Sequence, residues 1–327
     1  MPCPSDKAEV YACTSDDANA QARSLQGWSQ LYDQLSSGSF HGAIEGICTD
    51  AVHVFREATN ARLRQSCIVK SDAWWFGIPA RDDVSFRLDA RVVPSGEIAI
   101  RRGQQVFELM TPESFEIFGI VVKRQNLEEH LRLFYDANPP GEQEDLLLAS
   151  PRLRGRLRVL LQELLSQTSL HPEVAQSANA REAMEQSLMD IIADACCDRS
   201  HGESREVSRA ERQQAMLVRD VREYLLSLDD RVASVPELCR NFNISRRTLQ
   251  YAFEQVLGMG PNAYLKLLRL NGVRRDLSRR SALLKSVQQI AADWGFWHLS
   301  QFSKDYKQHF LELPSVTLKR SLDARVR

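Results

Sequence analysis

Between residues 234 and 314 the chain repeats one helical pattern, and this repeat constrains the fold more than any other feature. The first copy passes through Ile244 and Phe253, and the second passes through Phe296 and Tyr306. Corresponding residues of the two copies lie 52 positions apart up to the turn, as Ile244 and Phe296 do, and 53 positions apart after it, as Phe253 and Tyr306 do. The second copy therefore has one additional residue in its turn. The pattern predicts two helix–turn–helix units, which together could read two successive turns of a duplex.

The second helix of each copy has an outward face suited to base edges and phosphates. Ser245 is expected to cap the first of these helices, and Arg and Gln side chains read guanine and adenine in two-bond contacts. A single helix of this kind would be taken as an ordinary amphipathic helix, but two copies favour a DNA-reading face. The expected DNA contacts are Arg246, Arg247, Gln250, Tyr251, His298, Leu299, Ser300, Gln301, Lys304 and Lys307.

The net charge of −1 hides an uneven distribution along the chain. Residues 231–327 contain 17 Lys/Arg and 7 Asp/Glu, a net charge of +10, so the preceding residues carry −11. A basic C-terminal third on an acidic body indicates that this third binds a polyanion, and double-stranded DNA is the first candidate. A surface charge bias with no partner is the alternative.

The rest of the chain predicts an α+β protein. Short strand-like runs between residues 40 and 122 favour an antiparallel sandwich or barrel, and apolar spacing predicts helices around them, including one over residues 27–35. The expected organisation is a loose segment at 1–23, a sensor domain with trailing helices at 24–200, a linker at 201–207 and an all-helical DNA-binding domain at 208–327, with units at about 234–257 and 286–310.

Other chemistries find weaker support in the sequence. His41, His53 and Glu57 lack the His-x-His spacing of a metal-binding barrel, so polar strand residues are favoured over a metal site, and no catalytic residues are expected. Residues 74–76 could line a ligand pocket or belong to the core: Trp74, Trp75 and Phe76. Without ~18 consecutive apolar residues or a signal region, no membrane partner and a cytoplasmic location are expected.

The repeated region resembles the AraC/XylS family of bacterial transcription regulators. The motifs that carry the resemblance run from Ser245 to Phe253, from Leu257 to Leu265 and from Ile290 to Phe296. Two positions depart from the family pattern, since Tyr251 stands where Arg is usual and Leu311 where Gly is usual. The resemblance implies a sequence-specific transcriptional activator of a catabolic operon, which is not an enzyme, works with RNA polymerase and could form a homodimer.

A narrower resemblance extends into the N-terminal half, to the branch of this family that regulates ethanolamine-utilisation operons. Segments that carry it include Trp28 to Leu35, Val54 to Glu57 and Trp75 to Ala80. This resemblance implies ethanolamine as the effector, with adenosylcobalamin as a second effector and no catalytic cofactor. Two alternatives remain: a regulator that senses a different amine or small metabolite, and a barrel enzyme whose helices only target it to DNA.

Overall fold

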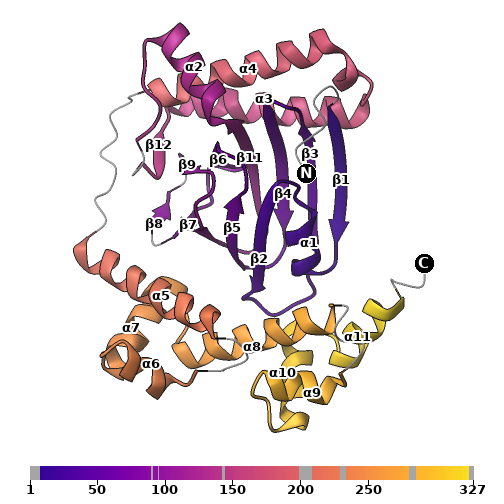
Figure 1. Cartoon of the computed structure of the whole chain (residues 1–327), viewed down its shortest axis with the longest axis vertical. Coiled ribbons are helices and arrows are strands. Elements are labelled where there is room, and N and C mark those ends of the chain that lie inside the picture. Colours follow the sequence, from indigo (N-terminus) through magenta and orange to yellow (C-terminus); the bar gives the residue numbers. More distant parts are fainter. Residues whose placement is uncertain are drawn as a thin grey trace. The chain divides into compact units, whose positions relative to one another are not determined.

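The chain divides into two compact units in the computed structural model (Figure 1). The β unit comprises residues 1–32, 40–88 and 92–206, and the helical unit comprises residues 33–39, 89–91 and 207–327. The structure describes residues 8–89, 91–94, 96–141, 144–198, 208–228, 233–279 and 285–323. The expected linker at 201–207 therefore lies outside the described residues.

Two sheets build the β unit within the described residues, and neighbouring strands within them pair antiparallel. The larger sheet has the strand order β1 (Glu9–Ser15), β3 (Gly42–Cys48), β4 (Val52–Thr59), β11 (Phe115–Lys123), β6 (Ala73–Pro79), β9 (Glu97–Arg102) and β12 (Leu146–Leu148). The smaller sheet has the order β2 (Trp28–Gln34), β5 (Leu63–Val69), β10 (Phe107–Thr111), β7 (Phe86–Leu88) and β8 (Arg91–Val93).

The larger sheet is buried on both faces, which is why its central strands β11 and β6 are apolar at almost every position. Val54 and Trp74 face a core shared with helices, whereas Phe55 and Trp75 face the smaller sheet. Successive side chains of a strand point to opposite faces, so one strand supplies both cores. All seven residues of β6 are buried.

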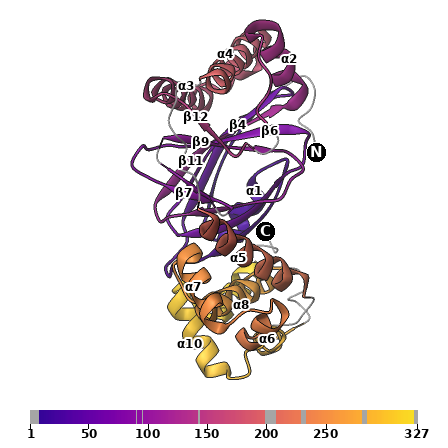
Figure 2. The same cartoon turned by 90° about the vertical axis from the view of Figure 1, so that its left-hand side faces the viewer.

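Three long helices cover the outer face of the larger sheet (Figure 2). They are α2 (Arg124–Tyr135), α3 (Pro151–Leu170) and α4 (Ala178–Cys197), and a short 3₁₀ turn at Val174–Gln176 precedes α4. The buried residues of α3 include Leu153, Leu157, Leu161 and Leu165, which recur every four residues and so form one apolar stripe against the sheet. The helices expected to trail the sheet domain are thus confirmed.

Two expectations for the N-terminal region are wrong. Within residues 27–35, Trp28–Gln34 form strand β2 instead of a helix, because the spacing of Trp28 and Tyr32 satisfies a period of two as well as a helical period. Within the segment expected to be loose, residues 9–15 form β1, whose backbone pairs with β3, and residues 18–24 form α1, capped by Asp17.

The helical unit contains α5 (Arg209–Ser227), α6 (Val235–Asn241), α7 (Arg246–Leu257), α8 (Pro261–Leu277), α9 (Val287–Asp293), α10 (Leu299–Phe310) and α11 (Pro314–Asp323). Its described helices follow one another with short connections. The predicted fold class is therefore confirmed, with a β-rich unit of two sheets followed by helices. Among the described residues, no helix is long and apolar enough to cross a membrane.

The buried imidazole of His53 should make the stability of the β unit depend on pH. Burial lowers the pKa of His53 from 6.5 to about 4, and its Nε2 lies 2.6 Å from the hydroxyl of Tyr11. The folded state binds this proton less readily than the unfolded chain, so stability present above pH 6.5 is lost as the pH falls toward 4. Between pH 7 and pH 5 the loss attributable to His53 is about 2 kcal/mol.

Urea unfolding of the full chain at both pH values, followed by tryptophan fluorescence, measures this loss. In His53→Gln the pH dependence should shrink by that amount. His171→Gln is the control, because the same substitution is made at an exposed imidazole after the end of α3 and should leave the pH dependence in place. A His53→Gln variant with the pH dependence of the wild type would show that the imidazole does not carry the effect.

Candidate nucleic-acid interface

The first helix–turn–helix unit consists of α6 and α7, and local sequence sets both of its helix starts. Ser234 caps α6 by accepting a hydrogen bond from the backbone N–H of Glu237, and Ser245 caps α7 in the same way through Thr248. Asn243 has a φ of 50°, a left-handed conformation that Asn tolerates better than most residues. The predicted cap at Ser245 and helix start at Arg246 are confirmed.

The second unit consists of α9 and α10. Ser286 and Gln289 form a reciprocal capping box at the start of α9, and Gly295 takes the left-handed turn with a φ of 75°. His298 caps α10, where its Nδ1 accepts a hydrogen bond from the N–H of Gln301 at 3.4 Å. Leu311 ends α10 in a left-handed conformation (φ 55°), so the departure from the usual Gly changes the residue but keeps the turn.

The second helix of each unit presents the predicted contact residues to solvent. On α7, Leu249 and Phe253 are fully buried, and on α10 Phe302 and Tyr306 are buried in the same manner. Gln250 is half-buried and the other predicted contacts are exposed: Arg246, Arg247, Tyr251, His298, Leu299, Ser300, Gln301, Lys304 and Lys307. The structure thus brings them onto the outer faces of two reading helices, while their contact with DNA stays a prediction.

These two faces differ in charge and in internal hydrogen bonding. No described carboxylate pairs with Arg246, Arg247, Lys304 or Lys307, so these four cations are open to an external anion. The amides of the two glutamines are already engaged within their helices. The Nε2 of Gln250 donates to Glu254 at 2.5 Å, and that of Gln301 donates to Asp305 at 3.0 Å. A base that binds either glutamine amide would have to replace the carboxylate of Glu254 or Asp305 as its hydrogen-bond acceptor.

Helix α8 holds the two units together within the helical unit. Its Tyr264 packs against Phe253 of α7, with ring centroids 5.4 Å apart. Near its other end, Gly272 leaves room for the indole of Trp294, because a Cβ at Gly272 would lie 2.3 Å from that ring. The indole N–H of Trp294 then donates to Asp276 at 2.7 Å. The connector predicted between the units is this helix.

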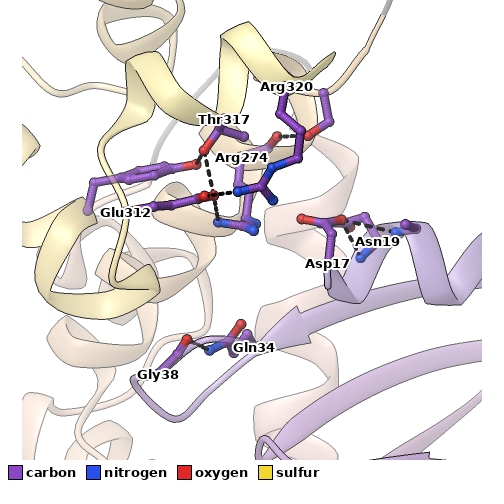
Figure 3. Close-up of polar contacts among 11 residues, drawn as sticks. Asp17, Asn19, Gln34, Gly38, Arg274, Glu312, Thr317 and Arg320 are labelled. Carbon is purple, nitrogen blue, oxygen red and sulfur yellow. Dashed lines mark hydrogen bonds and ion pairs between the residues drawn. The ribbon is translucent and has the colours of Figure 1, made fainter. Parts of the chain in front are cut away.

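A charged network ties α8 to the C-terminal end of α10 (Figure 3). Arg274 donates to the carboxylate of Glu312 at 2.7 Å, and the hydroxyl of Thr317 donates to the same oxygen at 2.8 Å. Arg320 binds the second oxygen of Glu312. Since the side chain of Arg274 is only 5% exposed, its charge depends on Glu312 for compensation.

A short segment from early in the sequence also belongs to the helical unit. Within Asp33–Ser39, the carboxylate of Asp33 accepts from Arg275 of α8 at 2.5 Å. The backbone of Gln34 exchanges two hydrogen bonds with the side chain of Asn271, at 2.9 Å and 3.0 Å. The amide of Gln34 closes the segment on itself by donating to the carbonyl of Gly38 (Figure 3). Sequence reasoning missed this segment, because contacts across more than 230 residues leave no local pattern.

The three predicted ligand residues of the β unit do not share one face. Trp74 and Phe76 are buried in the core beneath the helices, and Trp75 is buried on the opposite face. Trp75 stacks on Phe107 with ring centroids 4.9 Å apart and meets Trp28 edge to face at 6.0 Å. Only Trp75 therefore lies between the two sheets, and a ligand role for any of the three stays a prediction.

A buried carboxylate between the two sheets is the polar feature that sequence reasoning undervalued. Glu57 of β4 is 4% exposed and accepts hydrogen bonds from Gln21 at 3.0 Å, Tyr32 at 2.9 Å and Gln65 at 3.4 Å. Burial raises the pKa of Glu57, and these donors partly oppose the rise. The Oε1 of Gln65 has no hydrogen-bond partner among the described groups. Perturbed acids of this kind are candidates for ligand contacts.

Described residues of the β unit line a small cavity and a larger cleft. One of about 180 Å³ is lined by Trp28, His53, Val69, Ala73, Val121 and neighbouring residues. The other, a cleft of about 650 Å³, includes His41 in its lining. No group of three or more metal-ligating His, Cys, Asp or Glu side chains occurs in the part of the chain that the structure describes.

Comparison with known proteins locates the similarity in the helical unit. Residues 238–320 match a family model described as a helix-turn-helix domain. A probable thc operon regulatory protein of Rhodococcus erythropolis is 36% identical over 103 residues, covering 32% of this chain and 31% of that protein. A XylDLEGF operon transcriptional activator of Pseudomonas putida is 37% identical over 87 residues, covering 27% of each chain. The chain thus matches about a third of the length of these relatives.

Among solved structures, the AraC-like transcriptional activator CuxR is similar at 14% identity with a TM-score of 0.40. The similarity covers 80% of this chain and 94% of that one. By the match to the family model, residues 238–320 of the helical unit form a helix-turn-helix domain.

Removal of the Glu312 carboxylate should destabilise the helical unit. Glu312→Ala removes the carboxylate that compensates the buried charge of Arg274, which costs about 3–5 kcal/mol of unfolding free energy. Urea unfolding of the full chain measures the change, and Asp323→Ala on the exposed face of α11 is the control. Equal small losses in both variants would mean that the network does not hold α8 to α10.

Proposed function

We propose that this chain is a transcriptional activator of the AraC/XylS type that binds operator DNA through its helical unit and responds to a small metabolite through its β unit. One observation carries the proposal: two helix–turn–helix units, each with a capped and exposed reading helix, pack against the single helix α8. A catabolic operon is the target that the family resemblance favours, with RNA polymerase as a partner, a homodimer as the assembly and the cytoplasm as the location.

The charge of the reading faces supports DNA as the partner. Arg246 and Arg247 stand in the first turn of α7, where a reading helix meets base edges. Arg contacts guanine through two hydrogen bonds, and this chemistry suits Arg247 together with Gln250. Lys304 and Lys307 of α10 lie further along their helix and suit phosphate anchoring.

An amine effector fits the chemistry between the two sheets. Glu57 is a buried acid, and the donors that it receives from the described residues are neutral: Gln21, Tyr32 and Gln65. An ammonium group at this carboxylate would supply the opposite charge and would reverse the rise of its pKa. Because Glu57 lies in the larger sheet while Tyr32 and Gln65 lie in the smaller one, a ligand there would act on both sheets.

Ethanolamine is the effector that we favour, with adenosylcobalamin as a second effector. The cavity beside Trp28 has a volume of about 180 Å³, which is less than the roughly 300–1,000 Å³ of sites for drug-sized molecules. Such a volume suits a compound as small as ethanolamine, but Glu57 is not among the residues that line this cavity. Adenosylcobalamin is larger than this cavity, so it would need a wider surface. A regulator of a different small amine would use the same acid.

A barrel enzyme carrying a DNA-targeting helical domain is the second candidate. It would need reactive groups brought together in the β unit, and the Glu57 cluster is the feature that could serve it. Turnover of an amine substrate by the full chain would favour the enzyme. Saturable binding without turnover, coupled to DNA affinity, favours the regulator.

The first reading helix should give sequence specificity through Arg247 and Gln250. Arg247→Ala and Gln250→Ala should each weaken binding to a selected operator duplex by roughly 1–3 kcal/mol, with little change on random DNA. Fluorescence anisotropy with both duplexes measures this difference. Arg212→Ala on the exposed face of α5 removes the same charge away from the reading face. Equal losses of affinity for both duplexes would mean that α7 contacts phosphates and does not read the base sequence.

The Glu57 carboxylate should be needed for amine binding. Calorimetric titration of the full chain with ethanolamine, alone and with adenosylcobalamin, should give saturable heat in the wild type. Glu57→Gln keeps the size of the side chain but removes the charge, so affinity should fall about tenfold, or ~1.4 kcal/mol. Glu163→Gln, exposed on α3, is the control.

If the effector raises the affinity of the chain for operator DNA by a given factor, operator DNA should raise its affinity for the effector by the same factor. The absence of heat with either compound, with or without DNA, would remove the ethanolamine assignment. The helix-turn-helix reading would survive that result, because it rests on residues 238–320.

A further inference from the structure

The two helix–turn–helix units differ by one residue, and the structure identifies it as Trp297. The N–H of Ile244 donates to the carbonyl of Cys239 at 3.0 Å, and the N–H of Phe296 donates to Ala291 at 2.9 Å. These matching bonds align Ile244 with Phe296. In the first unit the next residue is already the helix cap, whereas in the second unit Trp297 comes before the cap at His298.

This additional residue is the large apolar side chain with the greatest exposure in the described part of the chain. Trp297 is 88% exposed, while Trp28, Trp74 and Trp75 are at most 6% exposed. Among the described aromatic rings, the indole meets the imidazole of His298 edge to face, with centroids 5.5 Å apart. Leu299, one residue into α10, is 40% exposed and extends the apolar surface at this end of the helix.

The position of this apolar surface makes DNA its best-supported partner. Residues at the N-terminal end of a reading helix are those that reach base edges in the major groove. The corresponding end of the first unit carries Arg246 and Arg247, whereas the second carries Trp297, His298 and Leu299. In the major groove the apolar group of a base edge is the C5-methyl of thymine.

We propose that Trp297 is a specificity-determining residue of the second unit, which contacts a thymine methyl group in the major groove. The proposal rests on the proposed function as a DNA-binding regulator. The two units would then read different chemistry: the first reads hydrogen-bonding base edges through Arg247 and Gln250, and the second reads methyl groups through an inserted indole. The inserted residue projects from the turn and so leaves the packing of Phe296 against Phe302 in place.

The test compares Trp297 variants on duplexes with and without the methyl group. The full-length wild-type chain first selects its preferred duplex from a random-sequence library, with ethanolamine and adenosylcobalamin present. Each thymine in the selected site is then replaced in turn by deoxyuridine, which lacks the methyl group. Affinity is measured for the wild type, Trp297→Ala, Trp297→Phe and the control Val316→Ala, which is 46% exposed on α11.

The expected result is a roughly tenfold loss for Trp297→Ala on the selected duplex and a partial loss for Trp297→Phe. At one thymine position, deoxyuridine should weaken the wild type by a similar factor and leave Trp297→Ala unchanged. If Trp297→Ala and the deoxyuridine replacement weaken binding independently at every thymine position, so that their two losses multiply, the proposed contact between Trp297 and a thymine methyl group is wrong. Unchanged DNA affinity with lost transcription would also overturn it, because the partner would then be a protein. A wild-type chain that selects no sequence would instead overturn the proposed function itself.

Discussion

The helical unit depends on the second half of α8, which is buried on every side. Residues 270–275 are buried without a break, so this stretch has no face left for solvent. A helix of this kind has to be surrounded by partners, and they are α9, α10 and α11 together with the segment Asp33–Ser39. The buried charges of Arg274 and Arg275 are compensated by carboxylates of these partners. Arg274 pairs with Glu312, and Arg275 pairs with Asp33. Both reading helices take their position from this one element.

The helical unit could be predicted from sequence because its signals are local. Ser245 starts α7 and Gly258 ends it, each through backbone geometry that involves only a few neighbouring residues. The apolar residues of α7 recur with a helical period, and the repeat supplied an independent check on every boundary. The exposed positions of the predicted DNA contacts followed directly from that periodicity. The sequence did not indicate that the side-chain amides of Gln250 and Gln301 would each donate a hydrogen bond to a carboxylate of the same helix.

The β unit was predicted only in outline, since its decisive contacts are remote in sequence. Trp28 and Tyr32 fit a helix and a strand equally well, and pairing with a distant strand decided between them. Trp74, Trp75 and Phe76 gave no signal of which face each would take, because a strand buried on both faces lacks alternation. Glu57 looked like a polar strand residue until the fold brought Gln21, Tyr32 and Gln65 around it. Likewise, the repeat predicted one additional turn residue in the second copy but did not identify it as the exposed Trp297, since exposure of a single aromatic side chain leaves no mark in the sequence pattern.

The membership of Asp33–Ser39 in the helical unit bears on how such a regulator can be recombined with others. A chimaera joined near residue 208 would carry α8 and α10 onto a foreign sensor but leave these seven residues behind. Arg275 and Asn271 would then lose Asp33 and the backbone of Gln34, and His309 would lose the carbonyl to which its Nε2 donates. The exchangeable module is therefore discontinuous in sequence. A designer would have to graft the early loop together with the late helices, or supply new partners for three buried polar side chains.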